Sequence, residues 1–198
     1  MAYDWDLLKK SVPRVYKYAD IICLSIDRNR KSWGGKKYDF NDTAFYAWVK
    51  GIDTEDKVKI YEDDFYIANL SSIENDNRQR NMVADYLGIG GWHIQIDSDE
   101  YFIDFKGFVN YLLRLSKSPT GKETPINVCC NWISLIKKTE SGYVYVDNPL
   151  TKCETMPFAT NKPLYLSTIT SGIPPTGVTI TGKPQAIDSN IDIGNPSL

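Results

Sequence analysis

Hydrophobic and polar positions in the first part of the chain change from a helical spacing to a strand pattern. The apolar residues that fall on one face of the expected first helix are Trp5, Leu8, Val12 and Val15. Pro13 is expected to kink or restart this helix, because it cannot donate a backbone hydrogen bond. The run ADIICLSID follows, and its length and its Ile and Leu content are typical of a strand buried on both faces. The pattern predicts a first strand that ends at Asp27.

The alternation of helix and strand continues beyond this point. Asn41 or Asp42 can cap a second helix that stops at Gly51, and the run DKVKIYEDDF has the character of a second strand. Ser71 and Glu74 have the spacing of a capping box before a third helix, which Gly88 ends. The residues of the third helix expected to face the core are Met82, Val83, Tyr86 and Leu87.

A third strand, WHIQID, completes a strand, helix, strand, helix, strand order. Short connections in this order predict right-handed βαβ units, with strands near residues 21–26, 58–61 and 92–96 in one parallel sheet. A short helix over residues 108–115 and a hairpin that turns at residues 140–142 are expected next. From Gly172 onward Gly, Pro, Thr and Asn dominate, which predicts a loosely ordered tail in which GVTITG can add an edge strand.

Composition limits the classes of protein that remain. A chain of 198 residues with 42% hydrophobic residues can bury one sizeable core. A net charge of -2 with interspersed signs argues against duplex nucleic acid as the main partner. The four cysteines lack CxxC spacing, which favours buried free thiols over disulfides or zinc. No apolar run resembles a signal peptide or a transmembrane segment, so we expect a cytoplasmic domain.

Acidic residues follow two of the predicted strands. Asp27 ends the first strand, and the pair Asp97 and Asp99 ends the third. Ligands of open α/β sheets bind outside the carboxyl ends of the strands, so these carboxylates are expected to line one crevice. A D-x-D pair can hold a hard divalent cation, with water and phosphate oxygens as the other ligands. A solvated acidic turn is the alternative interpretation.

The run NDNRQRNMVADYLGIGGWHIQIDSDEYF resembles the core signature of GT-A glycosyltransferases, in which an Arg-Asn pair opens a helix and a later strand ends in D-x-D. The run LLKKSVPRVYKYADIICLSIDRNRKSWGG is similar to that family's first helix, its second strand and the Asp that meets the nucleotide base. The resemblance covers residues 5–105. It implies a GT-A-like Rossmann-type three-layer sandwich, with a mostly parallel sheet plus a C-terminal hairpin, over residues 1–170. Residues 171–198 would form an irregular tail.

The resemblance also implies roles for individual residues. Asp27 would accept a hydrogen bond from the nucleobase, and Arg80 would reach the nucleotide side of the cleft. Asp97 and Asp99 would bind ribose and, through Mn²⁺ or Mg²⁺, the diphosphate. Independently of the family, a departing nucleoside diphosphate develops negative charge that a bound cation stabilises. Asp27 as a turn residue and Arg80 as a solvated helix residue are the structural alternatives.

The implied function is transfer of a sugar from a nucleotide sugar, with UDP-sugar as the expected donor, to a saccharide or lipid-linked acceptor. The expected location is the cytoplasm, including the periphery of a membrane. The family's first strand and its catalytic base are not recognisable, so the chain resembles a truncated member and its catalytic residue is unknown. A non-catalytic nucleotide-sugar-binding module is therefore the alternative. A nucleotidyltransferase is a third interpretation, disfavoured because no basic glycine-rich phosphate loop lies near the N-terminus.

Two further residues near these acids have open interpretations. His93 is the single histidine of the chain and is expected to be structural or to support a neighbouring site residue. Trp33 follows Asp27 and precedes two glycines, which suits a packed turn or a residue that stacks on a sugar.

Overall fold

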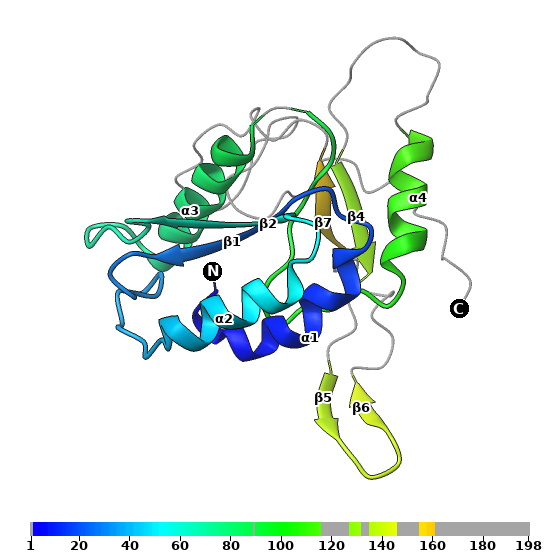
Figure 1. Cartoon of the computed structure of the whole chain (residues 1–198), viewed down its shortest axis with the longest axis horizontal. Coiled ribbons are helices and arrows are strands. Elements are labelled where there is room, and N and C mark those ends of the chain that lie inside the picture. Colours follow the sequence, from blue (N-terminus) through cyan, green and yellow to red (C-terminus); the bar gives the residue numbers. More distant parts are fainter. Residues whose placement is uncertain (1, 89, 116–126, 132–134, 146–154, 161–198) are drawn as a thin grey trace.

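The computed structural model describes residues 2–88, 90–115, 127–131, 135–145 and 155–160, and these form a mixed α/β fold (Figure 1). The helices are the 3-10 helix η1 (Ala2–Asp4), α1 (Trp5–Tyr16), α2 (Asp42–Ile52), α3 (Ser72–Leu87) and α4 (Phe105–Leu115). The strands are β1 (Ile22–Asp27), β2 (Val58–Asp63), β3 (His93–Ile94), β4 (Asn127–Asn131), β5 (Leu135–Lys138), β6 (Tyr143–Tyr145) and β7 (Thr155–Thr160). No helix in this part of the chain combines the length and apolar character that crossing a membrane requires.

Strands β1 and β2 form a two-stranded parallel sheet, as the sequence predicts. Their register runs from Ile22 opposite Val58 to Asp27 opposite Asp63, and α2 provides the connection between them. Helices α1 and α2 lie on one side of this sheet and α3 lies on the other (Figure 1). The buried apolar core joins η1, α1, β1, α2 and β2 through Ala2, Leu8, Val12, Leu24, Ile26, Phe45, Val49 and Val58.

The prediction that residues 92–96 add a third parallel strand to this sheet is wrong. Only His93 and Ile94 form a strand, and they pair antiparallel with β7, in a second sheet of order β3-β7-β4. The partner comes from residues 155–160, far along the sequence, so a local apolar pattern carries no information about this pairing. The expected mixed α/β class is confirmed, whereas the GT-A-like three-layer sandwich with a mostly parallel sheet is not: the described strands form one parallel pair and two antiparallel sheets.

The expected hairpin is present. Strands β5 and β6 pair antiparallel, and Thr139 donates its backbone N–H to Gly142 O at 2.8 Å across the turn. The hairpin extends away from the helices in Figure 1. The predicted tail at residues 171–198, including GVTITG, lies outside the described residues.

Several helix ends follow the expected capping chemistry. The Asn41 side chain accepts from Ala44 N at 3.0 Å, and Ser71 and Glu74 form both halves of a capping box. Gly88 follows α3 with a φ of 81°, a conformation that glycine adopts readily. Pro13 lies inside α1, which continues to Tyr16 as one helix instead of restarting.

Helix α3 buries polar side chains, which differs from the expected apolar face. Asn75, Asn77 and Gln79 are buried, whereas Tyr86 is 49% exposed and stacks on Tyr61 with ring centroids 4.4 Å apart. A buried amide costs free energy unless its donors and acceptor are paired. These amides therefore require hydrogen-bond partners outside the helix, and Gln79 Nε2 donates to Ser25 Oγ of β1 at 2.5 Å.

Asn75 shows how this requirement is met. It is fully buried, and its Nδ2 lies 3.1 Å from Trp33 O, 3.1 Å from Ile67 O and 3.3 Å from Leu70 O. Its Oδ1 accepts from Ile67 N at 2.8 Å. One side chain thus ties the loop after β1 and the loop after β2 to the first turns of α3.

Replacing Asn75 with alanine should lower the free energy of unfolding by about 2–4 kcal/mol, because buried backbone groups lose their partner. Chemical denaturation measures this change. Asn110→Ala is the matched control, since Asn110 is exposed on α4, and its effect should stay within about 0.5 kcal/mol. Equal effects of the two substitutions would contradict the role assigned to Asn75.

Candidate functional site

Asp27, at the carboxyl end of β1, is completely buried. Its Oδ1 accepts from Asn29 N and Lys31 N, both at 3.0 Å. Its Oδ2 accepts from Phe65 N at 3.0 Å and from Tyr66 N at 3.2 Å. Hydrogen bonds to a carboxylate are among the stronger ones in proteins, so this side chain holds together the loops that follow β1 and β2.

Arg30 is a second residue that holds the loop after β1, through hydrogen bonds to neighbouring elements. Its backbone φ is 55°, an uncommon value for a residue other than glycine. Its side chain donates from Nη1 to Asp27 O and to Glu62 Oε1, both at 2.7 Å, and from Nη2 to Asp42 Oδ1 at 2.5 Å. Because these partners come from β1, β2 and α2, the loop leaves β1 in a defined direction toward Trp33.

Arg80 connects this loop to the acidic residues that follow β3. Its guanidinium carbon lies 5.6 Å from the centre of the Trp33 ring, a cation–π distance. Its Nε donates to Asp76, one helical turn earlier, and its Nη2 donates to Asp97 Oδ1 at 3.1 Å. The Arg80 side chain is only 9% exposed, so most of its charge is balanced by these two carboxylates and not by water.

Residues 97–100 form a tight acidic turn. Glu100 N donates to Asp97 O at 3.1 Å, and Asp97 N donates to Glu100 Oε2 at 2.8 Å. Glu100 is 6% exposed, whereas Asp99, between them, is exposed. The turn therefore holds Asp97 and Glu100 in place and presents the Asp99 carboxylate to solvent. We call Asp76, Arg80, Asp97, Asp99 and Glu100 the acidic cluster.

The acidic cluster contains four carboxylates and one guanidinium, and neighbouring groups respond to this excess of negative charge. Burial raises the pKa of Tyr3, and the Asp99 and Asp97 carboxylates raise it further. Burial also raises the pKa of Asp76, although Arg80 opposes this shift and Asp97 reinforces it. A cation near Asp99 would relieve the repulsion among these carboxylates.

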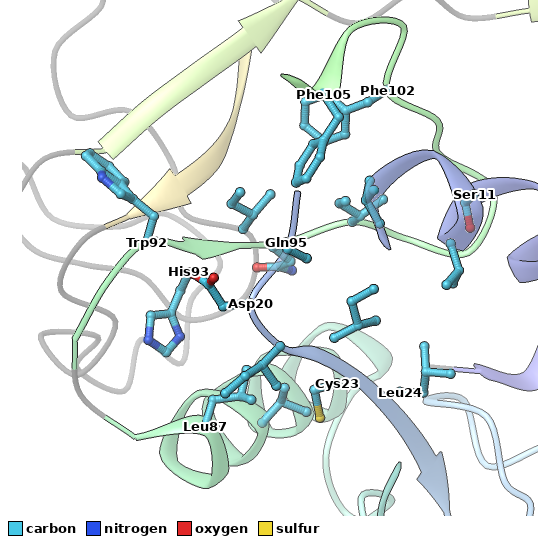
Figure 2. Close-up of a pocket in the computed structure, with 18 of the residues that line it drawn as sticks. Ser11, Asp20, Cys23, Leu24, Leu87, Trp92, His93, Gln95, Phe102 and Phe105 are labelled. Atoms are coloured by element: carbon cyan, nitrogen blue, oxygen red, sulfur yellow. The ribbon is translucent and has the colours of Figure 1, made fainter. Parts of the chain in front are cut away.

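A cavity of about 470 Å³ opens beside the acidic cluster. It lies between β1 and the segment that contains β3, with α3 below and α4 residues above in the view of Figure 2. Arg80, Asp97 and Glu100 belong to its lining, which is otherwise mostly apolar. Burial raises the pKa of the Cys23 thiol in its wall to about 12, consistent with the expected free thiol at this position.

The structure brings some of the predicted site residues together. Arg80 and Asp97 are in direct contact, and Asp99 follows them in the same turn. No contact joins Asp27 directly to Arg80 or Asp97 among the interactions described. Asp27 binds the backbone of the loop after β1, and Trp33 of the same loop packs on Arg80. Its location differs from the expected nucleobase contact, because both carboxylate oxygens bind backbone N–H groups and no part of the residue is exposed.

Sequence reasoning did not select Asp76 or Glu100, although both hold the acidic cluster in place. Asp76 precedes Arg80 by four residues, a spacing that places an acid and a base on the same face of a helix, so this signal was available. The backbone contact between Glu100 and Asp97 depends on the turn conformation and has no comparable sequence signal. The sequence leaves a packed turn and a sugar-stacking residue as alternatives for Trp33, and its ring packs on the Arg80 guanidinium.

No protein-family model matches the chain, and neither a curated protein nor a solved structure matches it. The function is therefore inferred from the residues and their geometry.

Asp27→Asn should lower the free energy of unfolding by about 3 kcal/mol, because an amide NH₂ would face backbone donors in a buried site. Asp39→Asn, at an exposed position, is the control and should change stability little. Urea denaturation of both variants measures the difference. A stable Asp27→Asn variant would show that the four backbone contacts contribute little.

His93 should make stability depend on pH. Burial lowers its pKa below the ordinary value of 6.5, although hydrogen bonds to the Gly90 and Gly88 backbone oppose the shift. The unfolded chain therefore takes up the proton at higher pH, so this contribution to stability is fully present above pH 6.5 and is lost as pH falls through the folded-state pKa.

The single histidine allows a direct test. Urea midpoints at about pH 7.5 and about pH 5.5 should differ more for the natural chain than for His93→Gln. An equal pH dependence in the two proteins would assign the effect to carboxyl groups instead.

Proposed function

We propose that the acidic cluster binds the diphosphate of a nucleotide sugar together with Mn²⁺ or Mg²⁺, and that the protein transfers the sugar to a saccharide or lipid-linked acceptor. UDP-sugar is the proposed donor. The main support is the asymmetry of the two D-x-D carboxylates. Asp97 is held by Arg80 and by the turn, whereas Asp99 is exposed beside it.

The two carboxylates of Asp97 and Asp99 suit a cation whose other ligands are water molecules and phosphate oxygens. Mg²⁺ binds through one or two carboxylates and completes its shell with water and substrate phosphates. Among the described residues, no group of three or more His, Cys, Asp or Glu side chains is arranged to enclose a metal ion. A pair formed by Asp97 and Asp99 therefore fits an open site that a diphosphate completes better than a closed structural metal site.

The residues around this pair would have separate tasks in the proposed reaction. Asp99 and Asp97 would bind the cation, while Arg80 keeps the Asp97 carboxylate in position. When bound, the cation would stabilise the negative charge of the departing diphosphate. Trp33 would keep the Arg80 guanidinium oriented from the opposite side. The group that activates the acceptor is not assigned.

A non-catalytic nucleotide-sugar-binding module is the second candidate, and the burial of Asp27 favours it. The residue expected to contact the nucleobase has both oxygens engaged by backbone groups. Recognition of the base would then depend on other residues of the loop that follows β1. Metal-dependent binding of a UDP-sugar without transfer or hydrolysis would select this candidate.

Asp99→Asn should abolish or greatly weaken Mn²⁺-dependent binding of UDP while leaving the fold intact, because Asp99 is exposed. A loss of at least about tenfold in affinity is expected for removal of one metal-binding carboxylate. Isothermal titration with UDP, with and without Mn²⁺, measures the effect. The thermal unfolding midpoint without ligand reports whether the fold is retained.

Asp56→Asn provides the matched control, because Asp56 is exposed and precedes β2, at the amino end of the parallel strands. Its affinity for UDP should equal that of the natural chain. Unchanged metal-dependent binding in Asp99→Asn, or an equal loss in Asp56→Asn, would remove the D-x-D pair from the proposed site.

A further inference from the structure

The cavity beside the acidic cluster has the size of a small-molecule site. Strand β1 lines one side and the segment that contains β3 lines the other, and α3 and α4 also contribute to the lining (Figure 2). Its volume of about 470 Å³ falls within the range of roughly 300–1,000 Å³ that is typical of such sites. At about 30 Å³ for each molecule of liquid water, this space corresponds to roughly fifteen waters.

Most of the cavity wall is apolar. Leu8 and Val12 of α1, Val83 and Leu87 of α3, and Phe105 of α4 contribute to it. Apolar walls give enclosed water few hydrogen-bond partners, so water is a poor occupant of this part of the cavity. The occupant should therefore be apolar over most of its surface.

Polar groups of the lining meet where α3 faces the acidic turn. Arg80 donates to Asp97 Oδ1, and Asp97 N donates to Glu100 Oε2. Gln79 precedes Arg80 on α3, and the Gln95 side chain lies beside the Arg80 guanidinium. All five residues line the cavity, so an apolar occupant that carries one polar group can place that group here.

The charge of the lining decides which polar group is favoured. Among the described residues, three carboxylates belong to the lining, namely those of Asp20, Asp97 and Glu100. Arg80 provides its one permanent positive charge, and burial lowers the pKa of His93, so the imidazole adds little charge at neutral pH. A cationic group is therefore attracted and an anionic group repelled, and both effects are stronger where apolar walls exclude water.

We propose that this cavity binds a small apolar amine, whose ammonium group contacts the polar end at Asp97 and Glu100 and whose hydrocarbon part lies along the apolar walls. A carboxylate accepts up to about four hydrogen bonds, so the contacts that these two side chains make are compatible with a further donor. A fatty acid would instead bring a carboxylate against carboxylates of the wall. The proposal goes beyond nucleotide-sugar transfer, since it requires neither a nucleotide nor a metal ion.

Three probes with the same eight-carbon chain test the proposed chemistry, namely octylamine, 1-octanol and octanoate. Isothermal titration of the full chain at about pH 7.5 measures their affinities without metal or nucleotide, so the result does not depend on the proposed function. Octylamine should bind at least about tenfold more tightly than 1-octanol, and octanoate should bind most weakly. Hexylamine should bind about fifteenfold more weakly than octylamine, because two buried methylene groups are lost.

Methyl chemical shifts locate the bound amine. Octylamine should shift the methyl signals of Val83 and Leu87 in the wall, whereas Val49 and Val58 pack in the core outside the lining and should not change. Val83→Phe should reduce the affinity for octylamine at least about tenfold, because the larger ring fills part of the cavity. Asp85→Phe is its control, since Asp85 is exposed on the same helix and outside the lining.

A charge variant tests the position of the ammonium group. Glu100→Gln should lower the ratio of octylamine affinity to 1-octanol affinity at least about threefold, because one attracting carboxylate is removed. The ratio cancels any effect of the substitution on the cavity that both probes share. Glu55→Gln is the control, because Glu55 is exposed before β2 and outside the lining, and its ratio should equal that of the natural chain.

Four results would overturn the proposal. They are absence of octylamine binding, equal affinity for octylamine and 1-octanol, and methyl shifts at Val49 and Val58 without shifts at Val83 and Leu87. The fourth is an unchanged ratio of the two affinities in Glu100→Gln. The methyl shifts and the probe series use the natural chain, so they decide the matter even where a substituted chain does not fold.

Discussion

The buried carboxylate of Asp27 is the interaction on which the arrangement of the candidate site depends. A carboxyl side chain without exposure to water is tolerated only when its oxygens are well paired, and four backbone N–H groups provide those pairs. Two of the donors lie after β1 and two lie after β2. A parallel pair of strands needs a long connection and has no hairpin turn to fix the ends, so this carboxylate supplies the link between the loops at their carboxyl edge.

A series of side-chain contacts connects the loop held by Asp27 to the acidic cluster. The loop that Asp27 holds carries Trp33, whose carbonyl binds Asn75 and whose ring lies over Arg80. Arg80 in turn holds Asp97. Each contact involves a side chain that is buried or mostly buried, and buried polar groups keep their geometry because an unpaired alternative is costly. Asp99 is the exception, and its exposure at the end of a rigid series of contacts suits a ligand-binding role.

Features that depend on neighbouring residues could be predicted from the sequence, and features that depend on distant partners could not. The cap at Asn41, the capping box at Ser71 and the hairpin turn follow from local patterns. The parallel pairing of β1 with β2 joins distant residues, but it follows from the consecutive order of strand, helix and strand along the chain. The pairing of β3 with β7 and the burial of Asn75 require knowledge of segments remote in sequence. In the candidate site, the order of Arg80 and D-x-D along the chain predicts that these residues lie together, and Arg80 does contact Asp97. For Asp27 the sequence leaves a nucleobase contact and a turn residue as alternatives, because a strand-end aspartate has the same local sequence whether it faces a ligand or four backbone donors.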